Sequence, residues 1–399
     1  FVGWRGGTQG EIRGVVETQG KLLDELGYLS GEIAGPLRFE GDVRFAGKEI
    51  WYGGRLTSPA VELFGFRLAE LAGDVAGGGP GNSTIGLDLE RGIYAGGPVS
   101  GRFEVDLDQA GPLARLALRA EGPRLLAVLE DLELPAPAFS ASAHGDLLYE
   151  FPLNDARRGV GSGSFELRPA PPAPPNAAGA VPVAGRAVLK LVEGRLELTQ
   201  VELASAAQRI ALTGAYDLVG KTGELAVEVV SEDLGELVRL QPFVDNVPPQ
   251  LWLPDTGSGR VIAHVALAGD SPASPIIGLE LDLADFHAPG VAAARARGSL
   301  TIDATAVRDL ELTLTRGAAS LRLGGVLPLA PASPAPRSAP VPPPLALDVE
   351  FQAWPVAEAG PWLPFPLPLA GEATGALHLG GSLDELTGDL RGSVSPVQV

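Results

Sequence analysis

Apolar and polar residues alternate along most of the chain, in short segments that Gly, Pro or Asp residues separate. The segments 210–214, 225–229, 310–314 and 345–351 all follow this period of two. A period of two is typical of β-strands that bury one face and expose the other. Most of the chain is therefore predicted to form strands with one apolar face.

Helical spacing is brief by comparison. It extends over residues 233–240, about two turns, and over a similar stretch at 122–129, where Pro123 stands at a position suited to the start of a helix. The pattern therefore predicts a nearly all-β chain with two short helical segments.

A repeat of about 113 residues runs through the sequence. Segments with matching glycines and alternating apolar positions start at Gly31, Gly145, Gly259 and Gly371, which are 114, 114 and 112 residues apart. An independent set recurs at a constant shift of 111: Val201, Leu203, Ile210, Leu212 and Gly214 become Leu312, Leu314, Leu321, Leu323 and Gly325. We expect a remnant of a preceding repeat at 1–30, full repeats at 31–144, 145–258 and 259–370, and a partial repeat at 371–399.

Two proline-rich segments fall inside repeats rather than between them. Residues 328–344 replace the short stretch 219–223 of the preceding repeat, and residues 169–182 also interrupt a repeat internally. Both are interpreted as loop insertions between strands, and no similar linker stands at the repeat junctions. The prediction is an elongated, continuous and curled β-sheet with an apolar inner face.

The candidate site is the aliphatic row on that face. In alternating strands it comprises Leu196, Leu198, Ile210, Leu212, Leu225, Val227, Val229, Leu312, Leu314, Leu321, Leu323, Leu345, Leu347, Val349 and Phe351. One interpretation is an open apolar groove. The other is the core of tandem β-sandwiches, which require two inner faces in each repeat.

The amino-acid composition disfavours or excludes several classes of function. The net charge is −19 and disfavours nucleic-acid binding through a basic face. Apolar residues make up 45% but aromatic residues only 6%, which predicts an aliphatic core. The chain contains no Cys, so disulfides and thiolate chemistry are excluded. It begins at Phe1 and has no Met, so we expect a fragment of a longer protein, with any membrane anchor outside it.

Candidate catalytic chemistry is sparse. Residues 214–222 resemble a phosphate-binding loop, but the glycine spacing is one residue too long, and a hairpin turn is expected instead. The four His residues stand singly, and no Gly-x-Ser-x-Gly elbow occurs. Acidic residues hold the polar positions of the strands, which predicts a solvated face: Glu197, Glu224, Glu228, Glu311, Asp348 and Glu350. We therefore expect no catalytic residues, no metal, no cofactor and no enzymatic activity.

Three features resemble the TamB (translocation and assembly module) family of the AsmA-like group. They are the repeated Gly-x-x-x-Gly-x-Leu-x-x-x-Gly motif, the stretch 54–75, and Leu-x-Gly-x-Tyr-Asp-Leu at 212–218. The resemblance implies a periplasmic protein whose anchor in the inner membrane lies outside this fragment. It also implies a U-shaped β-groove that conducts phospholipids between the inner and outer membranes or supports outer-membrane protein assembly.

The implied partners are phospholipid acyl chains and an outer-membrane assembly barrel of the TamA type. The alternative function is a surface adhesin or structural protein made of tandem β-sandwich repeats. Polar linkers at the repeat junctions would favour that alternative, and the sequence has none there.

Overall fold

The structure is a computed structural model. It describes residues 9–19, 33–47, 49–63, 66–79, 84–107, 111–132, 139–155, 158–170, 180–239, 256–267, 275–288, 291–329, 342–356, 370–382 and 385–398. The predicted remnant at 1–30 lies outside these residues except for 9–19, and so do Gly31 and most of the two proline-rich segments. The chain forms two compact units, Phe1–Ala178 with Pro182–Gln200, and Gly179–Val181 with Val201–Val399.

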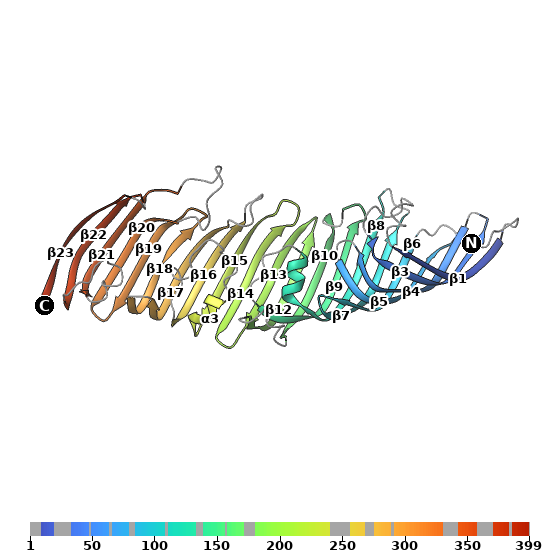
Figure 1. Cartoon of the computed structure of the whole chain (residues 1–399), viewed down its shortest axis with the longest axis horizontal. Helices are drawn as coiled ribbons and strands as arrows, with labels where there is room; N and C mark the ends of the chain where they lie inside the picture. Colours follow the sequence, from blue (N-terminus) through green and yellow to red (C-terminus); the bar gives the residue numbers. More distant parts are fainter. Residues whose placement is uncertain are drawn as a thin grey trace. The chain divides into compact units, whose positions relative to one another are not determined.

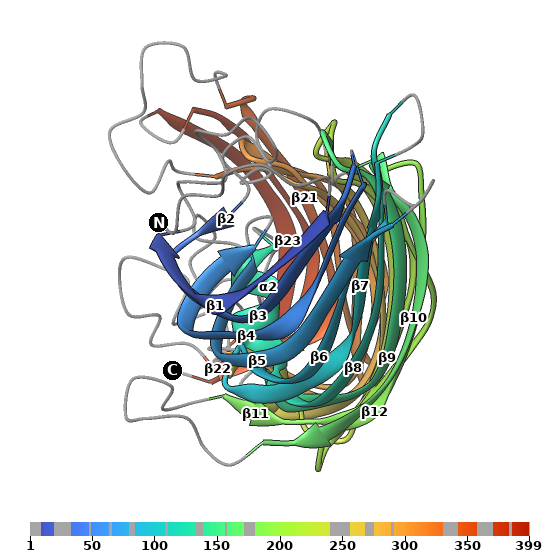
Figure 2. The ribbon, with the colours of Figure 1, turned by 90° about the vertical axis from the view of Figure 1, so that its right-hand side faces the viewer.

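Unit 1 is a series of antiparallel strands in which each long strand pairs with the next. The long strands are β1 (Gln9–Gln19), β3 (Pro36–Ala46), β4 (Glu49–Leu63), β5 (Phe66–Gly78), β6 (Thr84–Tyr94), β7 (Gly97–Asp106), β8 (Leu113–Arg124), β9 (Phe139–Pro152), β10 (Val160–Pro169) and β12 (Ala184–Val192). The two-residue strand β2 (Ile33–Ala34) accompanies them, and the two-residue strand β11 (Val181–Pro182) crosses the unit boundary. Figure 2 shows β4 to β9 bent into an arc.

Unit 2 is also a series of antiparallel strands. Neighbouring strands lie side by side, from green to red in Figure 1. After β13 (Arg195–Ala204), which crosses the unit boundary, come β14 (Gln208–Asp217), β15 (Thr222–Ser231), β16 (Thr256–Leu267), β17 (Ile276–Ala288), β18 (Val291–Ile302), β19 (Ala306–Arg316), β20 (Ala319–Pro328), β21 (Leu345–Pro355), β22 (Ala370–Gly381) and β23 (Leu386–Gln398). Antiparallel pairing links each strand from β14 to β23 with the next.

The all-β prediction is therefore confirmed, as is the continuity of the sheet within each unit. Pairing between sequential neighbours is the pattern of a meander, and within the described residues it does not split either unit into two stacked sheets. The arrangement argues against tandem β-sandwiches.

The strands also follow the period of the sequence. Six long strands, β3–β8, fall in the predicted repeat 31–144, and another six, β16–β21, extend from a few residues ahead of the predicted repeat 259–370 to Pro355. The predicted starts Gly145, Gly259 and Gly371 lie inside β9, β16 and β22. An even number of antiparallel strands makes equivalent strands run in the same direction and present equivalent residues on the same face. The repeat boundaries themselves stay a prediction.

Both expected helices are present. They are α2 (Leu125–Asp131), which packs on β8 and β9, and α3 (Leu234–Arg239), which packs on β16. Pro123 does not start α2, because β8 runs on to Arg124, whose N–H donates to the carbonyl oxygen of Ala95 (2.9 Å). In Figure 2, α2 lies on the inner side of the arc.

Candidate functional site

Strand register brings most of the predicted aliphatic row onto one face of unit 2. Leu212 pairs with Val227, and Ile210 pairs with Val229. Leu323 pairs with Leu312 on one side and with Val349 on the other. The same registers place Leu225, Leu314, Leu321, Leu345, Leu347 and Phe351 on this face too. Residues from five strands, β14, β15 and β19–β21, thus form one surface, which we call the apolar face of unit 2.

A single ladder of paired residues crosses this face from β14 to β23. Its members, one from each strand, are Ile210, Val229, Val261, Leu281, Gly298, Leu312, Leu323, Val349, Leu377 and Leu390. Only Gly298 lacks a side chain. Nine strand spacings of about 4.8 Å make the ladder about 43 Å long. Sequence reasoning missed its members on β16, β17, β22 and β23, although they show the same alternation.

Two predicted residues, Leu196 and Leu198, lie in the part of β13 that belongs to unit 1, and both are half-buried. Further along β13, Val201 and Leu203 are buried. The exposed neighbours Thr199 and Gln200 show that the alternation shifts by one residue within this strand.

Two buried clusters flank a half-exposed strip on the apolar face. One buried cluster contains Leu283, Ala296 and Leu314, and the other contains Leu300, Ile302, Val307, Leu310 and Leu329. Leu281, Leu312 and Leu323 pack against both clusters yet remain only partly buried. The centre of the face is therefore a strip of half-exposed aliphatic side chains.

The corresponding face of unit 1 carries aromatic rings that lie against glycines. The ring of Phe39 lies over Gly41 and Gly54, and the ring of Phe165 lies over Gly163. Phe151 is buried, and it stacks on Tyr149 with ring centroids 5.0 Å apart. The expectation of an aliphatic core is thus incomplete for unit 1. The sequence did contain a signal for these contacts between rings and glycines. An aromatic residue stands two positions from a glycine at 39–41 and at 163–165.

The opposite face of each unit carries ion pairs that link different strands. In unit 1, Arg55 of β4 pairs with Asp74 of β5 (3.4 Å) and with Glu90 of β6. In unit 2, the Arg260 Nε lies 2.6 Å from the Glu228 Oε1 and lowers the pKa of Glu228 by hydrogen bonding. Each pair joins residues that are far apart in sequence, so alternation alone did not reveal it.

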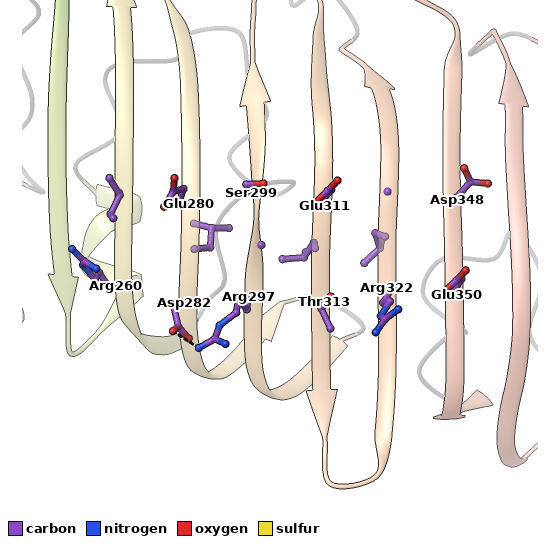
Figure 3. A pocket seen from close by; sticks show the side chains of 16 residues that line it. Arg260, Glu280, Asp282, Arg297, Ser299, Glu311, Thr313, Arg322, Asp348 and Glu350 are labelled. Carbon is purple, nitrogen blue, oxygen red and sulfur yellow. Dashed lines mark hydrogen bonds and ion pairs between the residues drawn. The ribbon is translucent and has the colours of Figure 1, made fainter.

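Asp282 of this charged face pairs with two arginines. Its two oxygens accept hydrogen bonds from Arg295 (2.9 Å to Nε) and Arg297 (2.7 Å to Nη2). These hydrogen bonds hold the pKa of Asp282 well below its usual range. Figure 3 shows the Asp282–Arg297 contact beside Thr313 and Arg322.

A shallow hollow of about 850 Å³ lies over β16–β21 on the charged face. Its charged and polar lining is labelled in Figure 3, with Glu280, Ser299, Glu311 and Asp348 in one row across the strands. The predicted solvated face is confirmed for Glu224, Glu311, Asp348 and Glu350, which are exposed, while Glu197 and Glu228 are half-buried.

The segment that resembles a phosphate-binding loop is a hairpin turn, as expected. β14 and β15 pair up to Asp217 and Thr222, and the Asp217 Oδ1 accepts hydrogen bonds from the N–H groups of Val219 and Gly220, both at 2.8 Å. An aspartate that bonds the following backbone amides is typical of a tight turn. Two amides of the turn, those of Val219 and Gly220, are therefore already occupied.

Comparison of the chain with protein-family models, with curated proteins and with solved structures gives no match. Within the described residues, no helix has the length and apolar character to cross a membrane.

Proposed function

We propose that this chain belongs to the class of β-groove lipid-conducting proteins. In particular, we propose that it is a section of a bridge-like periplasmic protein that conducts phospholipids between the inner and outer membranes. The observation that carries the proposal is the aliphatic ladder from Ile210 to Leu390, most of whose side chains are half-exposed, opposite a charged face. Large exposed apolar surfaces mark binding sites for apolar partners.

The physical argument concerns the acyl chains. Each methylene kept from water is worth about 0.8 kcal/mol, so a two-chain lipid faces a barrier of roughly 20 kcal/mol or more in water. A ladder of about 43 Å exceeds the ~30 Å hydrocarbon core of a bilayer, which is two chains deep. Neighbouring positions on the ladder are nearly equivalent, so a chain can slide between them without first returning to water.

Resemblance to the TamB family supports the remaining parts of the proposal. These are a periplasmic location, an inner-membrane anchor outside this fragment, a role in lipid transfer or outer-membrane protein assembly, and a TamA-like barrel as partner. The proposal includes no catalytic step and no cofactor, because the groove only lowers a solvation barrier. An adhesin of tandem sandwiches is less well supported, since the strands of each unit pair in sequential order.

Adjacent residues on opposite faces of β14 provide the test. Leu212→Glu puts an unpaired charge on the apolar face, whereas the neighbouring Thr213→Glu puts the same charge on the exposed face. We expect Leu212→Glu to lower both the lipid recovered with the chain and vesicle-to-vesicle transfer of a fluorescent phospholipid at least tenfold. Thr213→Glu should stay within twofold of the unsubstituted chain.

Mass spectrometry of co-purifying lipid and circular dichroism accompany the transfer measurement. Leu323→Glu, one repeat later, should behave like Leu212→Glu. A folded Leu212→Glu variant that binds and transfers lipid at the original rate contradicts the proposal.

A further inference from the structure

Helix α3 covers one end of the apolar face of unit 2. Its first residue, Leu234, is 0 % exposed and lies in a cluster with Leu283, Ala296, Leu314 and Trp354. These partners come from β17, β18, β19 and β21. A single aliphatic side chain thus occupies apolar surface that continues directly into the half-exposed strip.

The strands next to α3 contain two buried polar atoms without partners. Gln208 and Ser231 face each other across β14 and β15, and they are only 1 % and 3 % exposed. The Gln208 Nε2 donates to the carbonyl oxygen of Asp233 (2.7 Å), which fixes the orientation of the amide. The Gln208 Oε1 and the Ser231 Oγ have no hydrogen-bond partner in the described part of the chain. Buried polar atoms without partners disfavour the covered state, because water would satisfy both atoms if the helix lifted.

The helix itself adds little to hold the cover in place. It has six residues, a length that does not form a stable helix without tertiary contacts. The described contacts that fix its start are the burial of Leu234, the Gln208–Asp233 hydrogen bond, and the Asp233 Oδ1 accepting from the N–H of Gly235 (2.9 Å). Among these described contacts, the burial of Leu234 is the one that a lipid chain can replace.

We propose that α3 is a displaceable cover and that the surface beneath Leu234 is an acyl-chain site. In the lipid-free chain Leu234 occupies this site, and an entering acyl chain replaces it against Leu283, Ala296 and Leu314. Gln208 and Ser231 keep the covered state weak enough for exchange. The inference rests on the proposed function and adds an autoinhibitory contact to it.

The absence of cysteine from the sequence gives a clean background for the test. Leu234→Cys places one thiol under the cover, and Val307→Cys places one in the other buried cluster, at a residue that is also 0 % exposed. In the 399-residue chain without lipid, we expect an aqueous maleimide to label Leu234→Cys at least tenfold faster than Val307→Cys. Monomeric lysophosphatidylcholine should raise the Leu234→Cys rate severalfold further and leave the Val307→Cys rate unchanged.

Two further measurements guard against an effect of the cysteine itself. Adding Ser231→Ala to Leu234→Cys removes one unpartnered hydroxyl, and should slow labelling without lipid about threefold. In the unsubstituted chain, amide hydrogen exchange of α3 should be faster than that of β16 and should accelerate with lysophosphatidylcholine. Equal labelling of the two thiols, or α3 exchange that the lipid does not change, overturns the inference.

Native mass spectrometry of the unsubstituted chain with lysophosphatidylcholine tests the displaceable cover and the proposed function separately. Binding of the lipid without any change at α3 refutes the displaceable cover and leaves the proposed function standing. Failure of the unsubstituted chain to bind the lipid refutes both.

Discussion

Two hairpins of unit 2, β14–β15 and β20–β21, stand one predicted repeat apart and pair in the same way. Leu212 lies opposite Val227 in the first hairpin, and Leu323 lies opposite Val349 in the second. Their connections are unlike each other: four residues, 218–221, in the first, and sixteen, 329–344, in the second. The pairing of apolar residues across the sheet therefore sets the register, and the length of the connection does not.

The hairpins also differ at their far ends. β15 ends at Ser231 and continues into α3, whereas β21 bends at Ala353, which has a φ of 47°, and buries Trp354. Leu234 of α3 and Trp354 belong to the same buried cluster. Equivalent strands thus share the centre of the apolar face and differ where that face is closed.

The largest expected effect concerns the glycine that the two hairpins share. Gly214 and Gly325 have φ values of 144° and 129°, and a Cβ on either would overlap a carbonyl oxygen of the paired strand. We expect Gly214→Ala and Gly325→Ala each to lower the free energy of unfolding by at least about 3 kcal/mol. Equilibrium denaturation in urea, followed by circular dichroism, measures both.

The neighbouring Gly324→Ala is the matched control. Its Cβ would lie 3.5 Å from the Leu310 carbonyl oxygen, an ordinary contact. The free energy of unfolding should change by less than about 1 kcal/mol. If Gly214→Ala and Gly325→Ala differ widely, the two hairpins are not structural equivalents.

A smaller effect should be confined to the short turn. Asp217→Ala removes the acceptor for the N–H groups of Val219 and Gly220, and should lower the free energy of unfolding by about 1 kcal/mol. Asp217→Asn keeps an oxygen in the same place and should recover most of that loss. An effect of Asp217→Ala no larger than that of Asp217→Asn would show that the turn chemistry is not needed.

The smallest effect is expected from shortening the long connection. Deleting residues 330–341 leaves four residues between β20 and β21 and should change the free energy of unfolding by no more than about 1 kcal/mol. Leu329 must stay, because it is buried and its N–H donates to the carbonyl oxygen of Thr305 (2.8 Å). The predicted insertion 328–344 was therefore too wide at its first residues, since Pro328 still belongs to β20.

Leu329→Ala is the contrast for the deletion, and it should lower the free energy of unfolding by about 2 kcal/mol or more. Both chains can be compared by urea denaturation. Global unfolding of the shortened chain would mean that the connection, rather than the sheet, holds β20 against β21.

The sequence by itself determined the strands and their two faces, since alternation is a local property that needs no knowledge of the partner strand. It predicted the apolar residues of β14, β15 and β19–β21, both short helices, and a hairpin turn within 214–222. It also predicted that the strands β14 and β20 are equivalent, because their apolar residues recur at a constant shift of 111.

Only the tertiary structure decided which residues meet. Arg260 reaches Glu228 across 32 residues of sequence, and Leu234 reaches Trp354 across a longer separation. Such contacts depend on register between strands, which alternation alone fixes only to within an even number of residues. The half-exposed centre of the apolar face and the unpartnered Gln208 and Ser231 likewise appear only when the strands are assembled, because burial is a property of the assembled sheet.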